Sequence, residues 1–234
     1  MIRYALVDGQ LREPVTGMKG ICPGCDKSLI AKCGPIKIHH WAHKQHIDCD
    51  PWWEQMTQWH LDWQNNFAPA CREVIFRDEQ SGEFHRADIH TAQAITIEFQ
   101  HSSLSLDELE SRNKFYKELI WVVNAQPFKN QFILGIQIPN PHSPLLARYN
   151  FSVNINGSAN FLQFYLKEEY RGQDPRRWMR MYSLNDPELE LVADEYYENP
   201  GRYYLFEWKY KRLAWLKSDA PVFLDLGDQF LYWI

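Results

Sequence analysis

Two short runs of alternating apolar and polar residues, at 84–90 and 94–100, stand at the centre of the chain. Both are rich in β-branched and aromatic residues, which predicts two strands joined at a short polar break. Ser105 and Glu108 then form a capping box, the usual start of a helix, and residues recur at helical spacing behind it. An apolar run at 120–123 predicts a further strand.

Two acids interrupt these otherwise apolar strands. Asp88 lies in the first run and Glu98 in the second, with Gln100 on the same strand face as Glu98. An odd-length loop places Asp88 on that face too, with Cβ atoms roughly 5–8 Å from those of Glu98, whereas an even loop places it opposite. Two carboxylates at this separation suit a shared divalent cation. The alternative is two acids on the solvent face of an antiparallel sheet.

The segments before the two strands complete a regular order of elements. An aromatic stripe at helical spacing predicts an amphipathic helix over 51–67, and 73–76 reads as a first strand. The predicted order is therefore helix, three strands, helix, strand. On the helix, His60 either orients substrate or a metal-bound water, or lies on the surface. Arg86 shares a face with Asp88 and either binds a phosphate or neutralises Glu98.

The first 50 residues carry a pattern of metal ligands. Cys22 and Cys25 form a CxxC knuckle, whose turn lets two thiolates converge on one ion. The segment 28–40 reads as a β-hairpin, and further ligands follow it. A closed structural zinc site needs four ligands, and we expect Cys22, Cys25 and His43, with Cys49 or His40 as the fourth. The other reading is a cysteine-rich loop with surface histidines.

The last hundred residues are harder to interpret. Prolines between 139 and 144 suggest a linker, and 151–166 resembles a hairpin. Arg176 and Arg177 flank Trp178, a combination that could grip a phosphate backbone and stack on bases. The same pattern fits solvated charges beside a packed aromatic core. The chain closes with two strand-like runs.

Composition limits the function classes. Of the 234 residues, 45% are hydrophobic, which is enough for a packed core. The net charge of −5 does not indicate a general affinity for nucleic acid. No apolar run has the length of a membrane span and the N-terminus is unlike a signal peptide, which predicts a cytoplasmic protein. In a reducing compartment clustered cysteines favour metal over disulfides.

The motifs HRADI, IEFQHS, RxxxY and WVVNA in combination resemble the nuclease core of the competence-protein CoiA-like family. That family belongs to the PD-(D/E)XK nuclease superfamily, in which an Asp and a Glu-x-Lys hold the catalytic metal. The resemblance implies a metal site at Asp88 and Glu98, with Gln100 in the usual place of Lys, and DNA as substrate. It also implies an acid from the preceding helix, at Glu54, and a supporting or DNA-lining role for Arg112.

Similar proteins also carry a CxxC and a later H-F/W-x-H segment before the core, which supports zinc. Taken together, the sequence predicts an α+β protein with a PD-(D/E)XK core at 51–138, a zinc-ribbon-like module at 1–50 and a β-rich region at 139–234. The predicted activity is Mg²⁺- or Mn²⁺-dependent cleavage of DNA, in DNA uptake, recombination or defence. The rivals are a non-catalytic nucleic-acid-binding module that keeps the fold, and an interaction protein acting through its aromatic C-terminal half.

Overall fold

The computed structural model describes residues 1–45, 49–52, 54–78, 82–156, 159–210 and 213–234. It forms two compact units, Met1–Lys129 with Arg212–Ile234, and Asn130–Lys211. Its helices and strands form an α+β arrangement with several separate sheets. Within the described residues, no helix combines the length and the apolar character that crossing a membrane requires.

The N-terminal sheet of the first unit has the order β2-β1-β3-β4-β5. Its strands are β1 (Ala5–Val7), β2 (Gln10–Arg12), β3 (Lys19–Ile21), β4 (Ser28–Lys32) and β5 (His40–His43). The predicted hairpin is confirmed, since β4 and β5 pair antiparallel. Leu29 and Trp41 are almost fully buried and pack with Cys22, which places the first knuckle cysteine in this small core.

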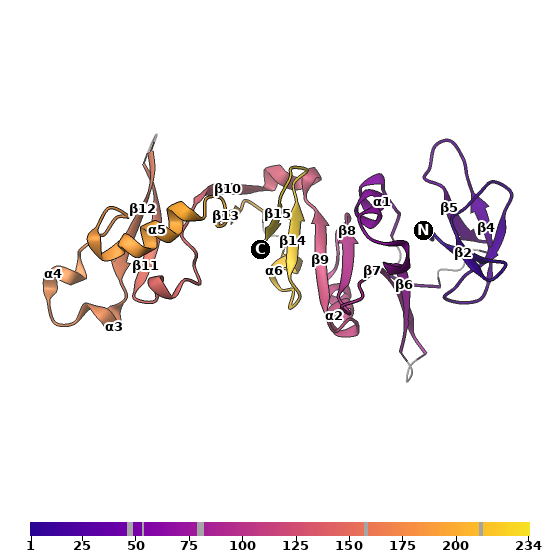
Figure 1. Cartoon of the computed structure of the whole chain (residues 1–234), viewed down its shortest axis with the longest axis horizontal. Helices are drawn as coiled ribbons and strands as arrows, with labels where there is room; N and C mark the ends of the chain where they lie inside the picture. The colour runs from indigo at the N-terminus through magenta and orange to yellow at the C-terminus, as the bar shows by residue number, and fades with distance from the viewer. Residues whose placement is uncertain (46–48, 53, 79–81, 157–158, 211–212) are drawn as a thin grey trace. The chain divides into compact units, whose positions relative to one another are not determined.

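The second sheet of this unit has the order β15-β14-β9-β8-β7-β6 (Figure 1). Its elements follow one another as α1 (Gln58–Asn65), β6 (Arg72–Arg77), β7 (Phe84–His90), β8 (Thr96–Gln100), α2 (Leu106–Phe115), β9 (Leu119–Asn124), α6 (Leu213–Leu216), β14 (Val222–Asp225) and β15 (Leu231–Trp233). The stretch from α1 to β9 reproduces the predicted order of helix, three strands, helix, strand. As the capping box predicted, the Ser105 hydroxyl caps α2 by accepting a hydrogen bond from the Glu108 amide.

The first helix is shorter than predicted. It begins at Gln58 instead of 51, because the Thr57 side chain accepts a hydrogen bond from the His60 amide and acts as its N-cap. Trp59 and Trp63 still pack on Phe99 of β8, as the aromatic stripe predicted. Residues 51 and 52 instead form a turn, and residues 54–56 lie in an irregular loop. Glu54 therefore reaches the sheet from a loop.

The predicted boundary at 138/139 differs from the division that the structure shows. The second unit begins at Asn130, and β14 and β15 return to the core sheet, where β14 pairs parallel with β9. Asp225 anchors this return, because its Oδ2 accepts hydrogen bonds from the indole N–H groups of Trp59 and Trp63 at 2.7 and 2.9 Å. Residues 139–234 therefore do not form one region.

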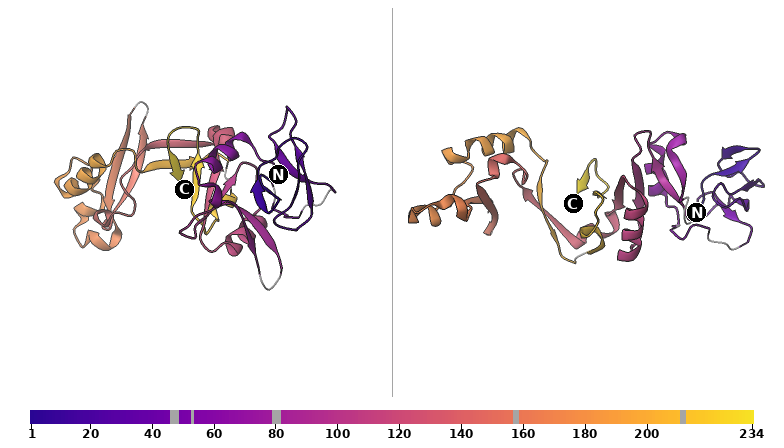
Figure 2. Two further views of the ribbon diagram at one scale, coloured as in Figure 1. Left: turned by 45° about the vertical axis from the view of Figure 1, so that its right-hand side comes forward. Right: turned by 90° about the horizontal axis from the view of Figure 1, so that it is seen from below.

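The second unit contains two separate strand pairs, β10 with β13 and β11 with β12. Its elements are β10 (Phe132–Gln137), β11 (Tyr149–Asn156), β12 (Ala159–Leu166), α3 (Glu168–Arg171), α4 (Pro175–Trp178), α5 (Glu190–Glu198) and β13 (Tyr204–Trp208). The predicted hairpin at 151–166 is present, although its tip at 157–158 lies outside the described residues. Leu189 and Val192 pack on this hairpin, beside which the helices gather (Figure 2).

Candidate active site and metal centre

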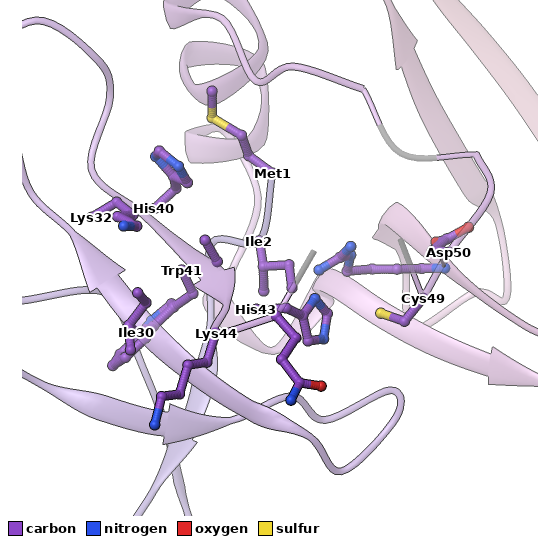
Figure 3. A pocket seen from close by; sticks show the side chains of 13 residues that line it. Met1, Ile2, Ile30, Lys32, His40, Trp41, His43, Lys44, Cys49 and Asp50 are labelled. Carbon is purple, nitrogen blue, oxygen red and sulfur yellow. Dashed lines mark hydrogen bonds between the residues drawn. The ribbon is translucent and has the colours of Figure 1, made fainter. Parts of the chain in front are cut away.

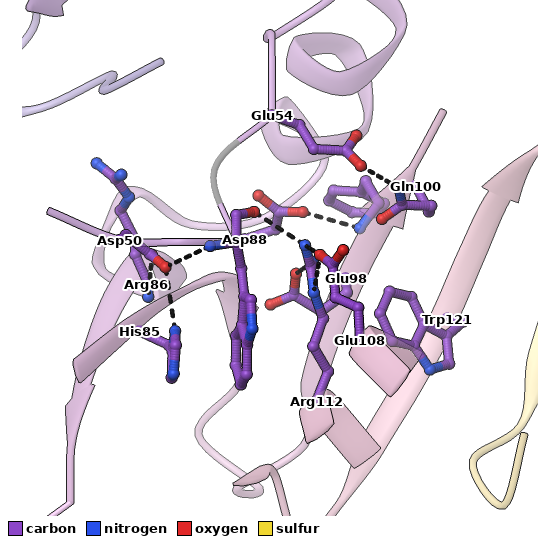
Figure 4. Close-up of polar contacts among 12 residues, drawn as sticks. Asp50, Glu54, His85, Arg86, Asp88, Glu98, Gln100, Glu108, Arg112 and Trp121 are labelled. Atoms are coloured by element: carbon purple, nitrogen blue, oxygen red, sulfur yellow. Dashed lines mark hydrogen bonds and ion pairs between the residues drawn. The ribbon is translucent and has the colours of Figure 1, made fainter. Parts of the chain in front are cut away.

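All five side chains that were predicted to act in catalysis line one small cavity of about 40 Å³. Figure 4 shows several of them at the centre of a polar network. The side chains are Glu54, His60, Asp88, Glu98 and Gln100. They come from the loop before α1, from α1 itself and from the neighbouring strands β7 and β8. The fold therefore gathers groups that lie more than forty residues apart.

The pairing of β7 with β8 decides how the two acids meet. Ile89 faces Ile97 and His90 faces Thr96, and this register carried one step further sets Asp88 opposite Glu98. The loop between the strands, 91–95, has an odd length, which was the condition for the two acids to share a face. The Phe99 amide donates a hydrogen bond to Oδ2 of Asp88 at 2.8 Å, which ties the acid to the opposite strand.

Glu98 is a buried carboxyl group with a single charged partner on one of its oxygens. The Arg112 guanidinium lies 3.1 Å from Oε2, whereas no described group donates a hydrogen bond to the buried Oε1. Burial and the negative charge of Asp88 raise the pKa of Glu98 well above its ordinary value, although Arg112 opposes the shift. The site therefore favours a positive charge, either a proton or a cation, at Glu98.

His60 holds Asp88 from the helix side. Its Nε2 lies 2.7 Å from Oδ1 of Asp88 and donates the hydrogen bond. Burial opposes protonation of the ring, but the charge of Asp88 and this hydrogen bond outweigh it and raise the pKa of His60. His60 is 6% exposed. Of the two alternatives left open by the sequence, a surface histidine is therefore wrong.

Glu54 and Gln100 contact each other at one side of the cavity. The Gln100 amide nitrogen donates to Oε1 of Glu54, and the Ser102 hydroxyl donates to the same oxygen at 2.7 Å. Nδ1 of His101 lies 3.0 Å from Oε2 of Glu54. Burial opposes ionisation of Glu54, yet the contacts with His101 and Ser102 hold its pKa below the ordinary value. The NH₂ group of Gln100 thus positions Glu54.

The predicted arginines have different roles. The Arg86 guanidinium pairs with Glu73 at 3.6 Å, so the suggestion that it neutralises Glu98 is wrong. That role belongs to Arg112, which is 3% exposed and also donates to Glu108 and to the Trp52 carbonyl. Its predicted contact with DNA would require these bonds to break. Arg176 and Arg177 are exposed on α4 in the second unit, where Arg176 pairs with Asp174.

Two acids that reach this network were not recognised from the sequence. Asp50 accepts hydrogen bonds from His85, from the Trp52 amide and from the Arg86 amide, and it lines the same cavity. Glu73 lines it too, with a φ of 50°, a left-handed conformation that is uncommon outside glycine and often marks functional sites. For Glu73, the signal available in the sequence was only its place at the start of a predicted strand.

The cysteine-rich segment gathers four ligand atoms. The side chains of Cys22, Cys25, His43 and Cys49 bring these atoms within 4.8 Å of one another. Sγ of Cys22 lies 3.9 Å from Sγ of Cys49, close to the roughly 3.8 Å between two sulfurs on a tetrahedral zinc. Hydrogen bonding with Cys49 lowers the pKa of Cys22 to about 4, while the Cys22 thiolate raises that of Cys49. This Cys₃His cluster could bind zinc.

The structure selects among the five ligand candidates. Cys49 joins the cluster, whereas His40 contacts the Ile38 carbonyl through Nδ1 at 2.8 Å and lies outside it. His46, a further histidine of this segment, lies outside the described residues. The CxxC knuckle is also fixed by packing, because a side chain at Gly24 would overlap the Phe84 ring of β7. The cluster thus lies against the core strands.

We expect the Arg112→Met substitution to lower the free energy of unfolding by about 3–5 kcal/mol at pH 8, because it leaves a buried carboxylate without its cation. The loss should be smaller at pH 5. A carboxyl group whose folded pKa lies above its unfolded value of 4.5 loses stability as pH rises through that window. Urea unfolding at both pH values measures the effect.

Two further variants control this experiment. Adding Glu98→Gln to Arg112→Met should restore part of the stability at pH 8, since the buried charge is gone. Lys114→Met changes an exposed cation on the same helix, 3.9 Å from Glu110, and should alter the free energy of unfolding by less than about 0.5 kcal/mol. A loss for Arg112→Met that is equal at both pH values would rule out the role of Glu98.

The chain matches two protein-family models. A family model described as the N-terminal domain of competence protein CoiA matches residues 11–51, the segment that contains the Cys₃His cluster. A second model, described as the nuclease-like domain of competence protein CoiA, matches residues 81–152, which include Asp88, Glu98 and Gln100. Neither the curated proteins nor the solved structures contain a match.

Proposed function

Because the chain belongs to the competence protein CoiA-like family, we propose that it is a metal-dependent nuclease that hydrolyses the phosphodiester bonds of DNA. We assign its elements from α1 to β9 to a PD-(D/E)XK core, since their order is that of the superfamily. One observation carries the proposal: Asp88 and Glu98 lie opposite each other on the adjacent strands β7 and β8 and line one cavity with Glu54, His60 and Gln100.

Asp88 and Glu98 would hold Mg²⁺ or Mn²⁺. The fit rests on Oε1 of Glu98, which is buried and lacks a hydrogen-bond donor among the described residues, and on the raised pKa of this group. Carboxylate oxygens are the ligands that both ions prefer. A bound ion of this kind lowers the pKa of a water and stabilises negative charge on a phosphate.

The surrounding side chains prepare these two acids. Arg112 donates a hydrogen bond to Oε2 of Glu98 and so holds the side chain in place, while Oε1 is left available for the ion. His60 and the Phe99 amide each donate to one oxygen of Asp88, which retains lone pairs on both. Gln100 cannot accept a proton as an amine would, so in this site it holds Glu54 in place. Preorganisation of this kind is where most of the catalytic advantage would arise.

The Cys₃His cluster would hold structural zinc, which would join the CxxC knuckle to β5 and to the segment that enters the core. Its four ligands complete a closed tetrahedral set, and no coordination position remains for a substrate. A module with so small a buried core gains much of its stability from such a metal.

A cleavage assay tests the nuclease proposal. Linear, circular and single-stranded DNA are incubated with Mg²⁺ or Mn²⁺ and either the wild-type protein or its Glu98→Ala variant. We expect cleavage by the wild type and none above background by the variant. The alternative is a nucleic-acid-binding module without turnover, which the glutamine in place of lysine favours. Equal absence of cleavage from both folded, zinc-loaded proteins would refute the nuclease proposal.

A further inference from the structure

A second cavity, of about 310 Å³, lies in the first unit between the β4–β5 hairpin and the start of the core (Figure 3). Two of the proposed zinc ligands, His43 and Cys49, also line it, but none of the roles proposed above uses the space itself. It shares Asp50 and Arg86 with the cavity that holds the acids, so the two are neighbours along the same surface.

One face of the hairpin supplies the wall of this cavity. Lys32 pairs with His40 and Ile30 with Ala42, and residues paired across an antiparallel ladder point to the same side. The Lys44 amide donates to the Ser28 carbonyl, which extends the ladder by one step. Of the residues in this register, all except Ser28 line the cavity: Ile30, Lys32, His40, Ala42 and Lys44. The wall thus has an apolar floor with basic edges.

His40 has a clear orientation in this wall. Its Nδ1 lies 2.8 Å from the Ile38 carbonyl and donates to it, which leaves Nε2 of the neutral ring as a hydrogen-bond acceptor. Figure 3 shows His40 beside Lys32, across the cavity from Cys49 and Asp50. Because His40 lies outside the Cys₃His cluster, its position at the cavity is not explained by zinc.

The opposite wall is less negative than its residues suggest. Asp50 is 4% exposed, and its carboxylate accepts hydrogen bonds from the His85 ring, the Trp52 amide and the Arg86 amide. Arg86 adds a guanidinium that Glu73 shares at 3.6 Å. The exposed charges at the cavity are therefore Lys32 and Lys44, in a chain whose net charge is −5. This local excess of cations does not follow from composition.

We propose that this cleft binds one strand of the nucleic acid, with phosphates at Lys32 and Lys44 and with Nε2 of His40 accepting a hydrogen bond from a sugar or base, and leads it toward Asp88 and Glu98. The inference rests on the proposed nuclease function and adds its substrate class. A cavity of about 310 Å³ is at the small end of ligand sites and accommodates about one nucleotide, not the cross-section of a duplex. Ile30 and Ala42 offer apolar contact to a sugar or base between the phosphates.

The experiment measures binding of a fluorescent single-stranded oligonucleotide to the full chain, without Mg²⁺, Mn²⁺ or chelator, across a range of NaCl concentrations. Each phosphate contact on a single strand contributes about 0.7 to the slope of log K against log salt. The double variant Lys32→Ala/Lys44→Ala should lower that slope by about 1.4 and weaken binding at 0.1 M salt roughly 25-fold. Lys37→Ala, an exposed change in the same hairpin but outside the cleft, should leave both unchanged.

The outcomes separate this inference from the nuclease proposal. A double variant that binds like the wild type, or a duplex bound as tightly and with the same lysine dependence, would overturn the inference whether or not DNA is cut. Lysine-dependent binding of a single strand, together with a wild type that cuts nothing, would support the cleft and refute hydrolysis. Zinc content and melting temperature, equal in all variants, ensure that the module is intact.

Discussion

Replacing Asp88 by asparagine is expected to lower the rate of DNA cleavage by about three orders of magnitude and to leave the protein folded. Asparagine keeps the shape of the side chain and an oxygen that can accept from His60. It removes one of the two charges that would bind the ion, and transition-state stabilisation by such an ion is worth several kcal/mol. Initial rates at saturating Mg²⁺, with the melting temperature measured alongside, test the prediction.

The matched control is Asp62→Asn. Asp62 is an exposed acid on α1, two residues from His60, and its contact is with Gln58 of the same helix. Its loss should change neither the rate nor the stability by more than a small amount. Cleavage by Asp88→Asn at the wild-type rate, with the control also active, would exclude Asp88 as a metal ligand.

The same substitution has a second expected consequence at Glu98. The charge of Asp88 is the largest cause after burial of the raised pKa of Glu98. Removing that charge should move the pKa of Glu98 down toward its ordinary value, so that it ionises at lower pH. Titration of the Glu98 carboxyl by NMR would show the shift, and an unchanged value would mean that the two acids are not coupled.

Local patterns predicted the elements that surround this site. The strands β7 and β8, the capping box at Ser105 and the β4–β5 hairpin all follow from periodicity and turn residues, because short-range preferences decide them. The shared face of Asp88 and Glu98 needed one further fact, the length of the loop between the strands. The sequence left that length open, and the structure resolves it as odd.

Contacts between distant segments were not predictable in the same way. The parallel pairing of β14 with β9, and the partners of Asp225, depend on where residues beyond 212 return, which no local pattern encodes. Strand parity suggested Arg86 as the partner of Glu98, and the family resemblance gave Arg112 only a supporting or DNA-lining role, whereas the structure pairs Arg112 with Glu98. The predicted start of α1 was wrong for a different reason. The aromatic stripe continues upstream of Thr57, but the Thr57 side chain caps the helix and sets its first residue.

The Cys₃His cluster and the proposed nucleic-acid cleft share one hairpin, so a change at the metal site is expected to affect both. His43 belongs to the cluster, while His40, three residues earlier on β5, lines the cleft. Cys22 is 2% exposed and packs against Leu29 and Trp41 of the same module. Loss of the metal should therefore loosen both the small core and the cleft wall.

We expect the Cys22→Ser substitution to abolish zinc binding and to lower the free energy of unfolding by about 4 kcal/mol or more, an effect of the size that lost metal sites produce. Zinc analysis and urea unfolding measure the two quantities. Cys33→Ser, a change at a half-buried cysteine outside the cluster, should retain zinc and stability. A chelator should destabilise the wild type to the level of Cys22→Ser and leave that variant unaffected. Zinc and stability equal to wild type in Cys22→Ser would refute the metal site, since a serine hydroxyl cannot replace a thiolate ligand at neutral pH.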